Sequence, residues 1–146
     1  MTTYLSCRTI AVCLLCAVVL LSAGCGTHPR IVPVHGHVTL SGKPVGPGDI
    51  LFIPKESKGT TGKAAVGYFE EDGRYVLTTN RKEDGAIVGH HTVVIRPRPT
   101  GVEPGAEFWG NATLPPIPPR YGDLTNSPLS AEVTPGTGEI NFDLTP

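Results

Sequence analysis

The chain has 146 residues, including 18 glycines, 15 prolines and four cysteines. Twelve lysine and arginine residues against thirteen acidic residues give a formal net charge of −1, which argues against a protein that binds nucleic acid by neutralising phosphates. A chain of this length predicts one domain. Its glycine and proline content disfavours long helices, whereas a hydrophobic fraction of 39% argues against disorder.

Residues 1–24 have the pattern of a cleaved secretory signal peptide. A short start carrying Arg8 precedes an uninterrupted apolar run from Ile10 to Leu21, and small residues follow. An apolar stretch of about 7–15 residues before small residues is typical of such signals. A transmembrane helix needs about 20 apolar residues, so this run is too short to cross a bilayer.

The end of this signal resembles a bacterial lipobox, in which small residues precede an obligatory cysteine. The matching residues are Ser22, Ala23, Gly24 and Cys25. The resemblance implies a diacylglyceryl group on the Cys25 thiol, cleavage just before Cys25 and acylation, for example with palmitate. It implies a lipoprotein held in a membrane of the bacterial cell envelope, facing the periplasm or the exterior. Two or three acyl chains anchor a protein far more firmly than one. The alternative is a plain secretory signal with an incidental cysteine.

The remaining cysteines support this interpretation. Cys7, Cys13 and Cys16 lie inside the signal, so Cys25 would be the only cysteine of the mature chain. A mature chain of that kind has neither a disulfide framework nor a cysteine metal site. Packing alone is therefore expected to hold the fold.

The mature chain is predicted to be all-β. Residues 25–33 contain two prolines and are expected to form a tether between the lipid and the domain. Beyond the tether, short β-branched and aromatic runs alternate with turn residues, as in a β-sandwich, and no apolar run has the 3.6-residue period of a helix. Asp72-Gly73 between two such runs predicts a hairpin. The predicted strands are residues 34–40, 49–53, 63–69, 74–79, 90–96, 129–133 and 140–144.

Alternation along these strands assigns an inward face, because successive side chains of a strand point to opposite sides of its sheet. His91, Val93 and Ile95 are expected to share one face. The predicted inward set is Val38, Leu40, Ile50, Phe52, Tyr75, Leu77, Val93, Ile95, Ile140, Phe142 and Leu144.

Residues 37–45, 71–79 and 88–95 resemble carboxypeptidase-regulatory-like, transthyretin-like domains. Residues 117–121, 127–129 and 142–144 resemble the matching parts of small bacterial lipoproteins that carry such a domain. The resemblance covers residues 34–146. It implies a seven-stranded, immunoglobulin-like β-sandwich with no catalytic residue and no cofactor. His91 departs from the family pattern, which often has an aromatic residue facing the core at that position.

The histidines are candidate metal ligands. His35 and His37 are two residues apart on a predicted strand, so both project from one face at a spacing that can chelate a metal ion. Copper or zinc binding would be favoured if His90 came near them. The alternative is that these histidines are ordinary outward-facing polar residues.

The segment Pro97–Pro119 is the most unusual part of the chain, with seven prolines in 23 residues and the only tryptophan, Trp109. Phe108 and Trp109, if exposed, would form a recognition patch for a sugar ring or a protein. Alternatively, the segment covers a sheet edge and its prolines block edge-to-edge pairing.

No nucleophile-elbow, zinc-protease or phosphate-loop motif is present in the sequence, so an enzyme is not predicted. The sequence predicts a lipid-anchored, non-catalytic envelope protein that serves as a structural or interaction module. The alternative is an envelope protein that binds carbohydrate through Phe108 and Trp109, or metal through His35 and His37. The expected partners are the membrane and an envelope protein or glycan.

Overall fold

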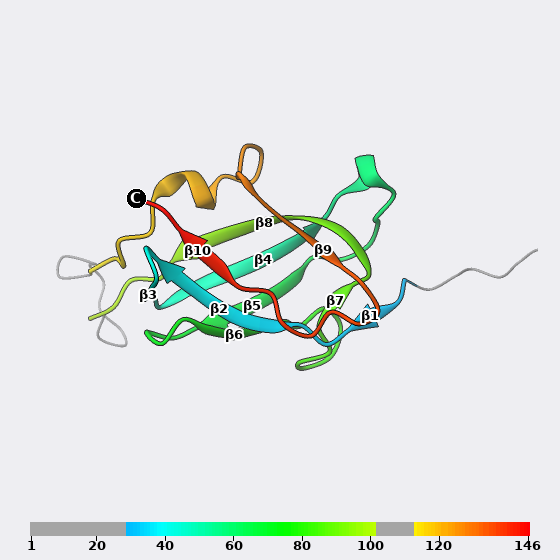
Figure 1. The fold of residues 1–146 in the computed structure, drawn as a ribbon, viewed down its shortest axis with the longest axis horizontal. Coiled ribbons are helices and arrows are strands. Elements are labelled where there is room, and N and C mark those ends of the chain that lie inside the picture. The colour runs from blue at the N-terminus through cyan, green and yellow to red at the C-terminus, as the bar shows by residue number, and fades with distance from the viewer. Residues whose placement is uncertain (1–28, 102–112) are drawn as a thin grey trace, which may run out of the picture.

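The computed structural model describes residues 29–101 and 113–146, and in this part of the chain the fold is built from β-strands (Figure 1). Two short 3₁₀ turns, η1 at Glu56–Lys58 and η2 at Pro119–Gly122, complete the described elements. The strands are β1 Ile31–Val32, β2 His35–Leu40, β3 Lys43–Pro44, β4 Gly48–Pro54, β5 Ala65–Phe69, β6 Arg74–Val76, β7 Ala86–Ile87, β8 Gly89–Pro97, β9 Leu129–Val133 and β10 Phe142–Leu144.

Seven of these strands form one continuous path, in the order β10-β2-β6-β5-β4-β8-β9. They are the seven strands predicted from the sequence, so both the all-β class and the strand positions are confirmed. All pairs along the path are antiparallel except β10 with β2, which is parallel. The pairing joins these seven strands, together with β3 beside β2, into one eight-stranded sheet, and β1 and β7 form a separate two-stranded sheet.

The sheet curls so that distant strands meet across its inner face. β10 and β4 are separated by three strands in the path, yet the rings of Phe142 and Phe52 lie 6.0 Å apart between centroids. The ring of Tyr75 on β6 lies 6.4 Å from the same Phe52 ring. Figure 1 shows β2 and β10 in front of β4 accordingly. Curling thus lets the sheet wrap around a core, to which residues outside the sheet, such as Val32, Ala86 and Tyr121, also contribute.

The predicted inward residues line this core. Ile50, Phe52, Leu77 and Leu144 are fully buried. Leu40 and Ile140 are partly buried and pack against the core cluster. The alternating pattern therefore identified the inner face correctly, because burial follows the two-residue period of a strand.

The hairpin predicted at Asp72-Gly73 is present between β5 and β6. Gly73 has a φ of 76°, in the left-handed region, and its amide donates a hydrogen bond to the carbonyl of Glu70. A Cβ at Gly73 would lie 2.2 Å from the carbonyl oxygen of Val38. Glycine is therefore required here both by the turn and by the close approach of β2.

The folded body begins earlier than the sequence indicates. Residues 25–33 were predicted to be tether, but Ile31 and Val32 form β1, which pairs with Ile87 and Ala86 of β7. Val32 is buried in the core cluster. The prolines that suggested a tether flank this short strand at positions 29 and 33, where they interrupt none of its pairs.

Candidate functional site

The outer face of the sheet carries an exposed apolar strip on β5 and β6. Val66, Tyr68 and Val76 are 47%, 42% and 44% exposed. Their chain neighbours on the inner face, including Phe69 and Tyr75, are buried. The same alternation that builds the core therefore leaves this strip, the Val66–Tyr68–Val76 strip, in contact with solvent.

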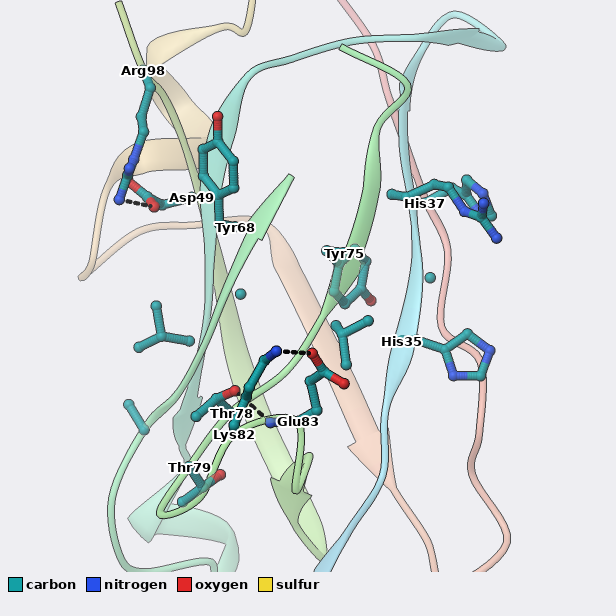
Figure 2. A pocket seen from close by; sticks show the side chains of 16 residues that line it. His35, His37, Asp49, Tyr68, Tyr75, Thr78, Thr79, Lys82, Glu83 and Arg98 are labelled. Carbon is teal, nitrogen blue, oxygen red and sulfur yellow. Dashed lines mark hydrogen bonds and ion pairs between the residues drawn. The ribbon is translucent and has the colours of Figure 1, made fainter. Parts of the chain in front are cut away.

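The strip forms the floor of a shallow groove of about 930 Å³ (Figure 2). Asp49, Tyr68 and Arg98 lie at one end of the groove, and Thr78, Lys82 and Glu83 lie at the other. His35 and His37 of β2 line its remaining side. The groove therefore combines an apolar floor with charged ends.

An ion pair closes the first end. The Arg98 Nε donates to Asp49 Oδ2 at 2.8 Å, and Arg98 Nη2 lies 2.7 Å from Asp49 Oδ1. The hydrogen bond with Asp49 raises the pKa of Arg98, so the guanidinium stays charged. The guanidinium carbon also lies 4.8 Å from the centre of the Tyr68 ring, within the range of a cation–π contact. Both the carboxylate and the tyrosine face are thus occupied by Arg98.

Structural hydrogen bonds hold the second end. Lys82 Nζ lies 3.3 Å from Glu83 Oε1, and the backbone amide of Glu83 donates to the Thr78 hydroxyl at 2.9 Å. The Thr79 hydroxyl donates to the carbonyl of Gly85 at 2.6 Å. The hydroxyl groups at this end therefore fix the loop that follows β6.

His35 and His37 share the outward face of β2, as the spacing predicts. The buried Gly36 lies between them, and Figure 2 shows both rings directed away from Tyr68. His90 does not join them, because it lies on β8, which β6, β5 and β4 separate from β2. Within the described ranges, no group of three or more His, Cys, Asp or Glu side chains is arranged in this structure to hold a metal ion.

The C-terminal segment places a carboxylate close to these histidines, and the sequence analysis did not identify it as a candidate site residue. Glu139 Oε1 lies 3.9 Å from His37 Nδ1, and Glu139 is the backbone partner of His35 in a parallel bridge. The alternation of residues 139–141 in the sequence indicates that Glu139 points outward. Only the structure shows that this segment runs parallel to β2 and therefore places Glu139 next to the histidines of β2.

His91 points into the core, on the face predicted for it. Its Nδ1 lies 3.1 Å from the carbonyl oxygen of Gly89, and its ring lies 5.8 Å from that of Phe52. A carbonyl can only accept, so Nδ1 carries the proton. Nε2 is buried and has no hydrogen-bond partner among the described residues. Burial lowers the pKa of His91, because a buried site disfavours the charged form of the ring.

The remaining predicted site residues, Cys25, Phe108 and Trp109, lie outside the described residues, so the lipid site and the aromatic recognition patch stay predictions. Among the helical segments that the structure describes, none has the length and apolar character of a membrane span. Comparison with known proteins found no matching family model, curated protein or solved structure.

Proposed function

We propose that the protein is a lipid-anchored, non-catalytic interaction module of a bacterial cell envelope, and that it binds a protein partner through the groove on its outer sheet face. The observation that carries this proposal is the exposed Val66–Tyr68–Val76 strip. Apolar side chains gathered on one open face are a feature of protein interaction sites. Their burial against a partner is favourable by about 25 cal/mol per Å² of apolar surface.

A lipid on Cys25 would hold the folded body close to the membrane. The folded body starts at Ile31, so only residues 26–30 separate it from the modified cysteine. At 3.3–3.6 Å per residue, that span reaches at most about 20 Å. A partner of the groove is therefore itself a membrane protein or a protein lying close to the membrane surface.

The chemistry of the groove favours a polypeptide over a glycan. Sugar rings are commonly bound on exposed aromatic faces, and Tyr68 is the aromatic side chain of the strip. Arg98 already covers the Tyr68 ring. The open part of the floor is aliphatic, which suits apolar side chains of a protein.

A non-catalytic role is supported by how the polar groups of the groove are used. Asp49 and Glu83 are held by Arg98 and Lys82. The Tyr75 hydroxyl donates to the carbonyl of Ile140, and burial raises the pKa of Tyr75, so this proton is retained. These groups make contacts within the protein rather than stand ready to activate a nucleophile.

We also propose that the folded body is related to a known family of β-domains. The seven-strand path and the resemblance of residues 37–45, 71–79 and 88–95 support a relation to the seven-stranded, immunoglobulin-like sandwich of transthyretin-like domains, here with the seven strands in one curled sheet. Residues 1–24 are the proposed signal peptide, and the body comprises β1 to β10.

The anchor is tested by intact mass spectrometry and detergent-phase partitioning of the full-length protein made in a bacterial host. The native chain is expected to enter the detergent phase with an acyl mass on Cys25, and Cys25→Ser is expected to remain aqueous and unacylated. A native product without an acyl mass contradicts the proposed anchor.

The groove is tested with a photo-crosslinking amino acid placed at Val66 in the anchored protein in cells. We expect a discrete crosslinked protein from position 66 and none from position 130, where Ser130 is exposed on β9 outside the groove. Val76→Lys in the same chain is expected to abolish that crosslink by placing a charge on the floor. Equal crosslinking from both positions, or an unchanged product with Val76→Lys, contradicts docking in the groove.

A further inference from the structure

Four polar side chains form a block at the rim of the groove, two on β2 and two on the C-terminal segment. His35 and His37 are the members from β2. Glu139 and Asn141 come from the segment that precedes β10, which runs parallel to β2. Two chain segments about 100 residues apart therefore present imidazole, carboxylate and amide groups on one face.

Hydrogen bonds fix the register of the two segments. The amide of His35 donates to the carbonyl of Gly138 at 3.0 Å, and the amide of Ile140 donates to the carbonyl of His35 at 2.9 Å. The amide of His37 donates to Asn141 Oδ1 at 2.8 Å. Asn141 Nδ2 donates to Glu139 Oε1 at 3.0 Å. Asn141 therefore links the backbone of His37 to the Glu139 carboxylate and positions that carboxylate beside the imidazole.

Gly36 makes this approach possible. A Cβ at position 36 would lie 1.8 Å from the carbonyl oxygen of Ile140, so any other residue would push the C-terminal segment away from β2. The sequence His35-Gly36-His37 thus combines two outward imidazoles with the one residue that lets Glu139 approach them.

From this arrangement we infer that His35, His37 and Glu139 form a Zn²⁺ site at the rim of the groove. Two imidazoles and one carboxylate are a ligand set that zinc accepts, with its remaining position open to water. The side chains of His37 and Glu139 are 43% and 54% exposed, and His35 is also exposed, so the two imidazoles have room to turn toward an ion beside the positioned Glu139 carboxylate. The backbone supplies the spacing, and the ion draws the side chains together.

This site differs from the one that the sequence suggested. The third ligand is Glu139 from the neighbouring segment, whereas His90 lies on β8, which three strands separate from β2. The difference provides a matched control, because His90 is a partly exposed histidine outside the proposed site.

The test is calorimetric titration of the full-length protein with zinc chloride at neutral pH. We expect one equivalent to bind, with the affinity at least tenfold weaker in His35→Ala and in His37→Ala. In Glu139→Gln, which keeps the size and hydrogen-bonding capacity of the side chain, we expect an affinity several-fold weaker. His90→Ala is expected to bind as the native chain does. Native affinity in His37→Ala, or an equal loss in His90→Ala, overturns the proposal.

A spectroscopic measurement identifies the ligands directly. Cu²⁺ substituted at one equivalent is expected to give an electron paramagnetic resonance spectrum with splitting from two imidazole nitrogens. The spectrum of His35→Ala is expected to show one. Circular dichroism of each variant verifies that the fold is retained. A native spectrum without coordinated imidazole, or the same spectrum from both chains, overturns the assignment.

Discussion

The two faces of the sheet formed by β2, β6, β5 and β4 differ sharply although the same strands build both. On the inner face, Tyr75, Phe69 and Ile50 are buried in one cluster. On the outer face, Val76 and Tyr68 are more than 40% exposed. The inner face is constrained by packing at near-crystalline density, whereas the outer face is free to carry binding groups. The proposed interaction groove and zinc site both lie on the outer side for this reason.

The strongest test of this difference compares two adjacent residues. Leu77 is fully buried and Val76 is 44% exposed. Leu77→Ala is expected to lower the free energy of unfolding by about 2–5 kcal/mol, because a cavity replaces packed side-chain atoms. Val76→Ala is expected to change it by about 0.5 kcal/mol. Urea unfolding measures both, and equal losses would show that the two faces are not distinct.

A second test asks how closely the C-terminal segment must pack on β2. Gly36→Ala is expected to cost about 1–3 kcal/mol, because its Cβ overlaps the carbonyl of Ile140. Gly136→Ala is the control, since a Cβ at Gly136 meets no atom within 4 Å. Thermal unfolding should separate the two variants by several degrees. An unchanged melting temperature in Gly36→Ala would mean that the segment is loosely held.

A third test uses pH, because the inner face contains an ionisable group, His91. Burial, and to a smaller extent the charge of His90, lower the pKa of His91 below its ordinary value of 6.5. Below pH 6.5 the unfolded chain therefore binds the proton more readily, and stability is lost as the pH falls. Each unit between the folded and unfolded pKa corresponds to about 1.4 kcal/mol lost at low pH.

His91→Phe removes this group and places an aromatic ring beside Phe52. Its free energy of unfolding is expected to fall less than that of the native chain between pH 7.5 and pH 5, measured by urea unfolding at each pH. If the free energy of unfolding depends on pH in the same way in both proteins, burial does not lower the pKa of His91 in the folded state, and the prediction is wrong.

The smallest expected effects belong to ion pairs of the outer face. Arg98→Ala removes a two-point contact with Asp49 and the contact with Tyr68, and is expected to cost about 0.5–1 kcal/mol, less at high salt. Lys82→Ala removes a pair whose lysine is 89% exposed, so no measurable change is expected. Melting curves at low and high salt provide the comparison. A loss above about 2 kcal/mol in Arg98→Ala would mean that this ion pair behaves as part of the core.

The sequence by itself determined the seven main strands, the Asp72-Gly73 hairpin and the inward residues. These features are local, because a two-residue alternation and a turn glycine act within a few positions of the chain. It also placed His35 and His37 on one outward face. It did not reveal the strand at Ile31–Val32, which depends on pairing with β7 and on burial of Val32 in the core.

The tertiary structure decided which faces meet. The curl that brings Phe142 to Phe52 depends on how all seven strands twist together. The parallel pairing of β10 with β2 joins segments about 100 residues apart, and it alone places Glu139, rather than His90, beside His37. Local patterns specify which side of a strand a residue occupies. Its neighbours across the sheet follow from strand order, which is set by the packing of the whole core.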